Sequence, residues 1–534
     1  MIAILHSASI HGIEANTIMV ETDLSAGIPG LTIVGLPDTA VNESKERIKA
    51  AIKNSGFSFP LKKVVINLAP ADVRKEGSGF DLPMSLGILI ASEALQPTPF
   101  LESACFIGEL SLEGSLRRVN GILSMAITAR EKGFKSIVVP FDNVAEASLV
   151  EGIDVYGLNH LGELPLFLVH PHSFIADAAK LRASWLSQLS QKQEKSTLID
   201  FADIKGQHQA KRVLEIAAAG GHNTLMIGPP GSGKSMLSKA FAGILPPLSE
   251  QEMLDVSRIY SAAGHLSKQQ PLITDRPFRS PHHSASAAGL VGGGNPPKPG
   301  EITLAHRGVL FLDEFVEFNR HAMEVLRQPL EDGVITISRA HQSHTFPARF
   351  TLVAALNPCP CGYRGDSVKA CQCSDTLVQR YLSKLSGPLL DRIDLHLEVP
   401  RLSAEALLRR DISEAPCESS LTIRSRVIQA REIQRIRFES LPIPQGGSRP
   451  VTNADLSARE LRLLCPLSEN AQEYLFKAMK RLNWSARAFD RILRVARTIA
   501  DLAACQAIEV PHLAEALQYR HLDRQANNQQ MTVA

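Results

Sequence analysis

Residues 225–240 read LMIGPPGSGKSMLSKA, and this short stretch indicates the fold of the central part of the chain. Three apolar residues that read as a buried strand lead into a glycine-rich loop, and a helix-forming run follows the loop. The loop consists of Gly228, Pro229, Pro230, Gly231, Ser232, Gly233, Lys234 and Ser235. Its glycines let backbone N–H groups converge on a phosphate, and the helix N-terminus adds the positive end of its dipole. The stretch therefore predicts a P-loop in an α/β fold, with ATP as the ligand.

Two polar residues of this loop have expected roles in binding ATP with Mg²⁺. The Lys234 ammonium neutralises the β- and γ-phosphate oxygens, and the Ser235 hydroxyl is a ligand for Mg²⁺. A second buried strand, GVLFLDE at residues 308–314, ends in Asp313 and Glu314. Acids at the carboxyl edge of a parallel sheet lie where such sheets bind ligands. We expect Asp313 to hold Mg²⁺ and Glu314 to polarise the attacking water, although acids also end strands simply because water solvates them.

Two further positions are candidates for the same chemistry. The apolar strand FTLVAALNP, residues 350–358, ends in Asn357, which can orient the attacking water, although Asn before Pro is also ordinary turn chemistry. The segment SGPLLDRIDLHLEV, residues 386–399, places Arg392 between Asp391 and Asp394. Arg392 either pairs locally with one of these acids or points into the nucleotide of a neighbouring subunit as an arginine finger.

The composition is that of a multidomain protein with a folded core. The chain has 534 residues, of which 44% are hydrophobic and 21% charged, and its net charge is +2. A chain of this length predicts two to four domains. No apolar run approaches the roughly 18 residues of a membrane span, and the opening MIAILHSASIHG lacks a basic segment before an apolar core, so we expect a cytoplasmic protein without membrane contact. The small net charge neither indicates nor excludes a nucleic-acid partner.

The order of the predicted elements divides the chain into five segments. Residues 1–168 alternate strand-like and helix-like patterns, 169–198 read as a linker, and 199–400 form a second α/β domain. Residues 401–523 are mostly helical, and 524–534 are expected to be a disordered tail.

Together the P-loop, FLDE at residues 311–314, Asn357, LLDRID at 389–394 and SARAFDRILRVAR at 485–497 resemble an AAA+ ATPase. More narrowly, NPCPCGYRGD at 357–366 and GIPGLTIVGLPDTAVNESKERIKAAI at 27–52 resemble the magnesium-chelatase-like ComM/YifB family. The resemblance covers nearly the whole chain. It implies a hexameric ring with a helical lid at 401–523, in which Arg487 is the sensor-2 arginine.

The resemblance also implies a DNA motor that drives branch migration of recombination intermediates during natural transformation. A long insert before FLDE and the hairpin GVITISRAHQSHTFPARF, residues 333–350, match elements that project into the pore of such a ring. The candidate DNA contacts are Arg339 and His341 at the hairpin tip and Lys298 in the insert. The polar tip suits phosphates rather than bases, but a tip that is merely solvated would read the same way. Basic helical runs at 424–439 and 477–497 are open to the same two interpretations.

The first domain resembles the Lon protease domain, a fold of the ribosomal S5 domain 2 type. The likeness lies in GELSLEGSLRRVNGILSMAITAREKGFKSIVVPFDN, residues 108–143, and in RKEGSGFDLPMSL, residues 74–86. Lon-type hydrolysis needs a serine that a buried, deprotonated lysine activates. Gly79 occupies the serine position, with Ser78 one residue earlier, and Leu123 occupies the lysine position. The dyad is lost, so we expect a binding or assembly domain.

Half of the eight cysteines lie within residues 357–374, NPCPCGYRGDSVKACQCS. Cys359, Cys361, Cys371 and Cys373 supply four thiolates, enough for a closed tetrahedral Zn²⁺ site of structural type. The spacing within each pair is tighter than in most zinc motifs, so inert cysteines and redox pairing remain open. If zinc is bound, it fixes the loop that directly follows Asn357.

Two rival functions use the same ATPase core. One is an energy-coupling subunit of a metal chelatase, which does not account for the Lon-like domain. The other is a protein-remodelling ATPase, which needs an aromatic pore loop where this insert offers the glycine-rich GLVGGGN, residues 289–295.

Overall fold

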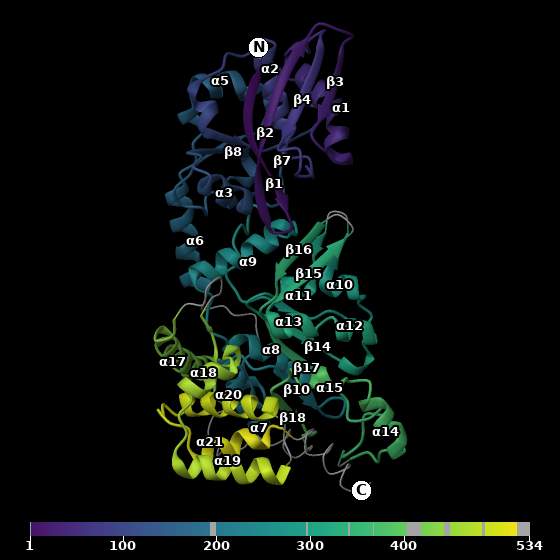
Figure 1. The fold of residues 1–534 in the computed structure, drawn as a ribbon, viewed down its shortest axis with the longest axis vertical. Coiled ribbons are helices and arrows are strands. Elements are labelled where there is room, and N and C mark those ends of the chain that lie inside the picture. The colour runs from purple at the N-terminus through teal and green to yellow at the C-terminus, as the bar shows by residue number, and fades with distance from the viewer. Residues whose placement is uncertain are drawn as a thin grey trace.

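The structure is a computed structural model that describes residues 2–192, 199–294, 297–339, 342–366, 368–402, 418–442, 449–482 and 486–520. The N-terminal α/β region and the rest of the molecule lie end to end, and the helical C-terminal region lies beside the second sheet (Figure 1). None of the helices in the described ranges has the length and apolar character needed to cross a membrane.

The N-terminal region is built on a seven-stranded mixed sheet in the order β3-β4-β2-β1-β5-β8-β9. Its strands are β1 (Ala3–His11), β2 (Glu14–Ser25), β3 (Gly30–Val34), β4 (Lys63–Ala69), β5 (Ala104–Phe106), β8 (Ser136–Pro140) and β9 (Asp154–Leu158), with a small hairpin of β6 (Glu109–Leu110) and β7 (Leu116–Arg117). Its helices are α1 (Thr39–Asn54), α2 (Asp81–Ala91), α3 (Ile122–Glu131), α4 (Val144–Ala147), α5 (Leu164–Val169) and α6 (Ala178–Lys192).

The local sequence explains why these elements form. Strand β4 alternates buried and partly exposed residues, which is the pattern of a strand with one covered face. Helix α2 is buried along its whole length, and its apolar run packs against β1 and β2. Within the segment predicted as a linker, α6 begins at Ala178, and Leu181 and Trp185 pack against the cluster beneath α3. The first part of α6 therefore belongs to the N-terminal region.

The central region contains a five-stranded parallel sheet in the order β11-β14-β17-β10-β18. Its strands are β10 (Thr224–Ile227), β11 (Phe278–Arg279), β14 (Val309–Leu312), β17 (Thr351–Leu356) and β18 (Leu395–Glu398). The helices around it are α7 (His208–Gly220), α8 (Lys234–Ile244), α9 (Glu250–Ala262), α10 (Ala287–Val291), α11 (Glu301–Leu304), α12 (Arg320–Glu324), α13 (Arg327–Asp332), α14 (Asp375–Leu382) and α15 (Gly387–Leu390). Because the strands are parallel and β17 lies between β14 and β10, the residues after β10, β14 and β17 emerge at one edge of the sheet.

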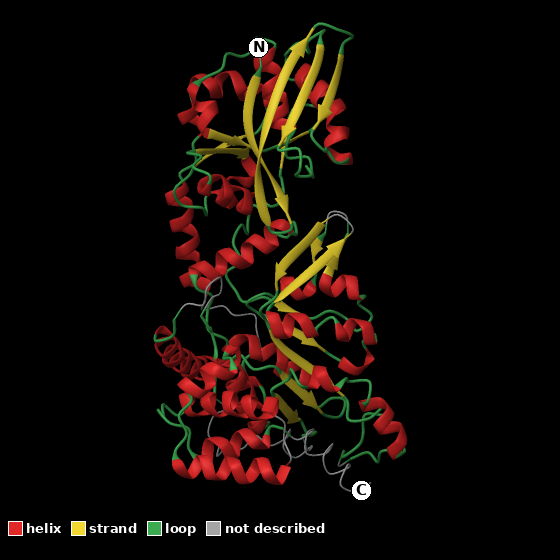
Figure 2. Ribbon diagram, in the orientation of Figure 1, coloured by secondary structure: helices red, strands yellow, loops and turns green. Residues whose placement is uncertain are grey.

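Two hairpins extend from this region. β15 (Val334–Arg339) pairs antiparallel with β16 (Gln342–Pro347), and the long pair rises toward the N-terminal region (Figure 2). A short pair joins β12 (Gly292–Gly293) to β13 (Lys298–Pro299).

The C-terminal region is helical, with α17 (Ser420–Glu439), α18 (Ala458–Leu464), α19 (Glu469–Leu482), α20 (Ala486–Leu502) and α21 (Val510–Gln518). Helices α17 and α20 pack directly on α7, and one hydrophobic cluster joins them to the central sheet. The core and the helical region therefore share a continuous interior.

The N-terminal region contacts the core through polar and apolar groups. The Gly121 N–H donates to the Ser261 carbonyl over 3.1 Å, and the Ser261 hydroxyl donates to the buried Glu146 carboxylate. Ile13, in the β1–β2 turn, packs against the cluster beneath the β15–β16 hairpin. These contacts link the N-terminal region to α9 and to the β15–β16 hairpin.

Candidate nucleotide site

The glycine-rich loop follows β10 and leads into α8, as the sequence predicts for a P-loop. A Cβ at Gly228 would lie 2.2 Å from the Val399 carbonyl oxygen, so only glycine lets the loop leave the sheet beside β18. Gly233 has a φ of +93°, a conformation that glycine adopts without strain, and α8 begins at the next residue. The helix thus presents its free N–H groups to the loop.

Lys234 is buried and its ammonium lies inside the loop. Its Nζ donates to the carbonyl oxygens of Gly228 at 2.6 Å and Pro229 at 3.0 Å, and to Asn357 Oδ1 at 3.4 Å. Burial lowers the pKa of Lys234, and the two acids at the end of β14 act against that effect. The ammonium and the residue after β17 therefore meet at the point where a terminal phosphate is expected.

The two residues predicted to hold Mg²⁺ are in contact. Ser235 Oγ donates to Asp313 Oδ2 over 2.7 Å, and the other Asp313 oxygen accepts the Glu314 N–H at 2.9 Å. Hydroxyl and carboxylate oxygens side by side are ligands that suit Mg²⁺, which binds one or two protein oxygens together with phosphates and water. The donor set therefore fits an ATP-bound Mg²⁺ ion.

Glu314 contacts a residue that the sequence did not single out. Its Oε2 lies 3.0 Å from His283 Nδ1, and both residues line a cavity of about 240 Å³. Glu314 has a φ of +49°, which is uncommon for a residue with a side chain. His283 belongs to the pair of histidines at 282–283 that follows β11, the strand next to β14. The two adjacent histidines were the feature in the sequence that could have drawn attention to this position. Only the order of the strands in the sheet places them next to Glu314.

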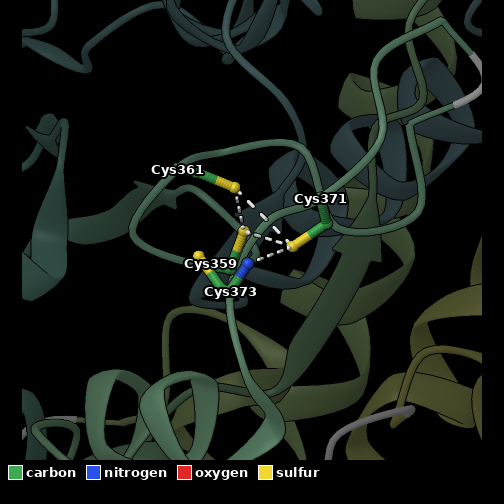
Figure 3. Close-up of side chains that lie close together, drawn as sticks. All are labelled: Cys359, Cys361, Cys371 and Cys373. Atoms are coloured by element: carbon green, nitrogen blue, oxygen red, sulfur yellow. Dashed lines mark hydrogen bonds between the residues drawn. The ribbon is translucent and has the colours of Figure 1, made fainter.

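The four cysteines form one cluster directly beyond β17 (Figure 3). Cys359 Sγ lies 3.3 Å from Cys361 Sγ and 3.6 Å from Cys371 Sγ, and the last two sulfurs are 3.6 Å apart. The four sulfur atoms, including that of Cys373, all lie within 4.8 Å of one another. Cys359 is fully buried, whereas the other three cysteines are partly exposed.

Arg392 forms a local pair, but not with the acids beside it in the sequence. Its guanidinium contacts the Glu331 carboxylate and donates to the Pro388 carbonyl oxygen over 2.6 Å. Asp394 instead accepts from His222 at 3.2 Å. Burial alone raises the pKa of Asp394, but the His222 hydrogen bond and nearby arginine charges lower it to about 2.

Arg487 shares its surroundings with Arg392 rather than with the P-loop. Both line a cavity of about 590 Å³ between the core and the helical region, and none of its lining residues belongs to the P-loop. The charges of both arginines also lower the pKa of Glu331. One chain thus carries a phosphate loop in one place and a pair of arginines in another.

Two of the three candidate DNA contacts, Arg339 and Lys298, lie on the two hairpins. Arg339 is the last residue of β15 and pairs in register with Gln342, while His341 lies outside the described residues. Lys298 is exposed on β13.

The basic run on α17 is largely neutralised within the chain. Arg426 pairs with Glu215 and Glu418, and Arg437 pairs with the buried Asp501. Arg435 pairs with two glutamates of its own helix, and Arg431 donates to the Ala218 carbonyl oxygen over 2.8 Å. Contacts within the chain, which neither interpretation of this run anticipated, account for these four arginines. On α20, Arg494 likewise donates to the Leu456 carbonyl oxygen over 2.9 Å.

In the N-terminal region the positions that we predicted to correspond to a Lon-type dyad hold residues that pack within the region. Leu123 is fully buried in the cluster beneath α3, and Gly79 packs near Ile107. Ser78 Oγ donates to the Glu109 carboxylate, and the buried Lys75 Nζ donates to a carbonyl oxygen at residue 70. The serine and the lysine nearest to it in sequence thus have different partners.

The parallel sheet with its P-loop agrees with the comparisons to known proteins. The family model for the magnesium chelatase subunit ChlI matches residues 200–407, a second ChlI model matches 20–143, and a ChlI C-terminal model matches 417–520. Fold and site together define an AAA+-like ATPase fold.

Full-length relatives then give the family. The chain is 44% identical over 523 residues to the YifB protein of Escherichia coli strain K12, and 43% identical over 529 residues to the competence protein ComM of Haemophilus influenzae. In both comparisons 98% of each chain is covered. The chain belongs to the ComM/YifB family of magnesium-chelatase-like proteins. Lon protease 2 of Bacillus subtilis is 28% identical over 205 residues, which is 34% of this chain and 36% of that protein.

Proposed function

We propose that the protein is an ATP-driven DNA motor that works as a hexameric ring on branched recombination intermediates during natural transformation. The observation that carries the ATPase part is the contact of Lys234 with Asn357 and of Ser235 with Asp313 at one edge of a parallel sheet. ATP with Mg²⁺ supplies the phosphoryl chemistry, for which Lys234 binds the phosphates and Glu314 positions the attacking water.

The ring part of the proposal is supported by the separation of the P-loop from Arg392 and Arg487. In a ring, the cavity that holds both arginines faces the P-loop of the adjacent subunit, so each nucleotide lies between two chains. Arg392 then acts on the charge that develops in the transition state, as an arginine finger does. Its pairing with Glu331 holds it in the cavity until a nucleotide on the neighbour competes for it.

The DNA part is supported by the relative named as a competence protein and by the form of the β15–β16 hairpin. One arginine per tip is a weak contact alone, but a ring offers several copies to one strand, and multivalency multiplies their effect. Binding through phosphates also predicts a steep loss of affinity with salt, because each neutralised phosphate releases counterions.

The first experiment measures ATP hydrolysis by the full chain alone and with single-stranded, duplex or branched DNA, together with the mass of the assembly. We expect a hexamer with ATP and stimulation that is strongest with branched DNA. An ATPase that ignores all three DNAs would favour the rival chelatase or protein-remodelling functions.

The second experiment locates the DNA contact. The double variant Arg339→Ala with His341→Ala should keep basal ATPase activity, because the nucleotide site is untouched, and should lose DNA stimulation and strand movement. Migration of branched DNA at the wild-type rate would remove the hairpin from this role, and Lys298→Ala in the insert then becomes the variant to test.

A further inference from the structure

The four cysteine sulfurs lie close enough together to surround a single metal ion. A Zn²⁺ ion bound at about 2.3 Å by four thiolates sets its sulfurs about 3.8 Å apart. The distances of 3.3 Å and 3.6 Å among Cys359, Cys361 and Cys371 are close to that value. They are far from the roughly 2.05 Å of a disulfide bond. The arrangement therefore fits one metal ion better than paired cysteines.

Backbone groups around the sulfurs support the same interpretation. The Cys373 N–H lies 3.4 Å from Cys371 Sγ, and the N–H groups of Tyr363 and Gln372 donate to Cys361 Sγ. Hydrogen bonds of this kind fix the direction of a metal ligand. Four sulfur ligands leave no position for a substrate or a reactive water, so the site is structural.

The loop that carries the cysteines lies directly on the P-loop. A Cβ at Gly362 would lie 2.8 Å from Pro230 Cδ and 3.9 Å from Asn357 Cγ. Cys361 precedes this glycine, and Cys359 follows Asn357 by two residues. At its far end, the loop leads into Ser374, whose hydroxyl caps α14. The cluster thus joins the end of β17 to the start of α14 across the phosphate-binding loop.

We infer that the four cysteines bind one Zn²⁺ ion and that this ion braces the segment around Gly362 against Pro230, keeping Asn357 within reach of Lys234. Three of the four cysteines are partly exposed, so hydrophobic burial alone holds this loop weakly and metal binding supplies its folding energy. The zinc site itself is independent of the proposed function. The effect on nucleotide binding rests on the proposed ATP site.

Metal content tests the site. The full chain, purified under reducing conditions from cells supplied with zinc, should carry about one zinc per chain by mass spectrometry. The double variant Cys371→Ser with Cys373→Ser should lose it, whereas Cys505→Ser, which changes a partly exposed cysteine elsewhere, should retain it. A wild-type chain without zinc, or with iron in its place, overturns the assignment.

Substitutions at two glycines with nearly equal backbone strain test whether the contact of this loop with Pro230 supports nucleotide binding. Gly362 has a φ of +82° and Gly365 a φ of +78°, but no atom lies within 4 Å of a Cβ built at Gly365. Gly362→Ala should therefore keep zinc and weaken the binding of a fluorescent ATP analogue about tenfold, a shift of about 1.4 kcal/mol. Gly365→Ala should keep both zinc and affinity.

A misfolded variant would also bind the analogue weakly, so the same effect is measured in the wild-type chain by removing zinc reversibly. A chelator should lower ATP-analogue affinity about tenfold, and added Zn²⁺ should restore it. Zinc-free protein that binds the analogue with unchanged affinity overturns the brace. If the zinc-loaded wild-type chain binds no nucleotide, the proposed function and the brace both fail, while the metal content still decides the zinc site.

Discussion

The two α/β regions of this chain differ in whether the residues expected at their candidate sites are present and in contact. In the central region the residues that ATP chemistry requires converge, with Lys234 beside Asn357 and Ser235 beside Asp313. In the N-terminal region the positions predicted to correspond to a Lon-type dyad hold the buried Leu123 and a glycine. Packing and catalysis depend on different side chains, so a folded α/β region does not by itself imply an activity.

The sharpest test of this contrast removes the P-loop cation. Lys234→Ala should abolish nucleotide binding, because the β- and γ-phosphates lose their main positive partner. Binding of a fluorescent ATP analogue measures the loss. Lys239→Ala, an exposed lysine on the same helix, is the matched control and should bind normally. Equal binding by the two variants would contradict the P-loop assignment.

The second test asks whether the arginine cavity completes the site of a neighbour. Arg392→Ala should reduce ATP turnover on the order of a thousandfold with ATP affinity largely kept, because a finger acts on transition-state charge. Steady-state hydrolysis and analogue binding separate the two quantities.

Mixing the variants makes this test decisive. Arg392→Ala and Lys234→Ala subunits each spoil a different half of the shared site, so some mixed interfaces contain both wild-type halves. Activity should therefore recover on mixing. No recovery would assign Arg392 a local structural role through Glu331.

The third test separates binding from chemistry within the central site. Glu314→Gln should bind ATP normally and hydrolyse it about a hundredfold more slowly, because an amide cannot take a proton from the attacking water. Single-turnover hydrolysis gives the rate. Glu317→Gln, three residues later and paired with Lys384, is the control. Near-normal turnover in the Glu314 variant would remove it from the catalytic role.

The fourth test concerns acid stability in the central region. Burial, with the charges of Arg307 and Arg349, lowers the pKa of His306 to about 3, and His306 Nδ1 accepts the Arg349 N–H at 3.1 Å. The folded chain keeps this histidine neutral, while the unfolded chain takes up a proton below about pH 6.5, so stability falls as the pH drops through that value. Between pH 7 and pH 5 the loss is about 2 kcal/mol. Thermal melting should show a weaker pH dependence in His306→Gln, and an unchanged one would contradict this assignment.

The smallest expected effect lies in the N-terminal region. Ser78→Ala should change neither ATP hydrolysis nor DNA-dependent activity, because Ser78 donates to Glu109 and no activating lysine contacts it in the described residues. The assay is degradation of an unfolded protein such as casein, with and without ATP. Degradation by the wild-type chain that disappears in Ser78→Ala would overturn the view that this region lacks peptidase chemistry.

Much of the central region was predictable from short-range patterns. The strand before the glycine loop, the helix from Lys234 and the strand ends at Asp313 and Asn357 follow from apolar runs bounded by turn and polar residues. In the N-terminal region the predicted strand 62–70 and the helix within 82–95 also form, as β4 and α2. These features depend on residues that are neighbours in the chain.

The sequence by itself determined the presence of a P-loop, the acids and polar residue that follow the adjacent strands, and the grouping of four cysteines. Only the tertiary structure decided which distant residues meet. The sheet order brings His283 to Glu314, the packing of α20 on the core puts Arg487 in the same cavity as Arg392, and the course of the loop sets Gly362 on Pro230. The tendency to form a helix, strand or turn is set by a few neighbouring residues. The contacts between distant residues arise because the chain buries its apolar side chains in one continuous interior, and no single segment specifies that arrangement.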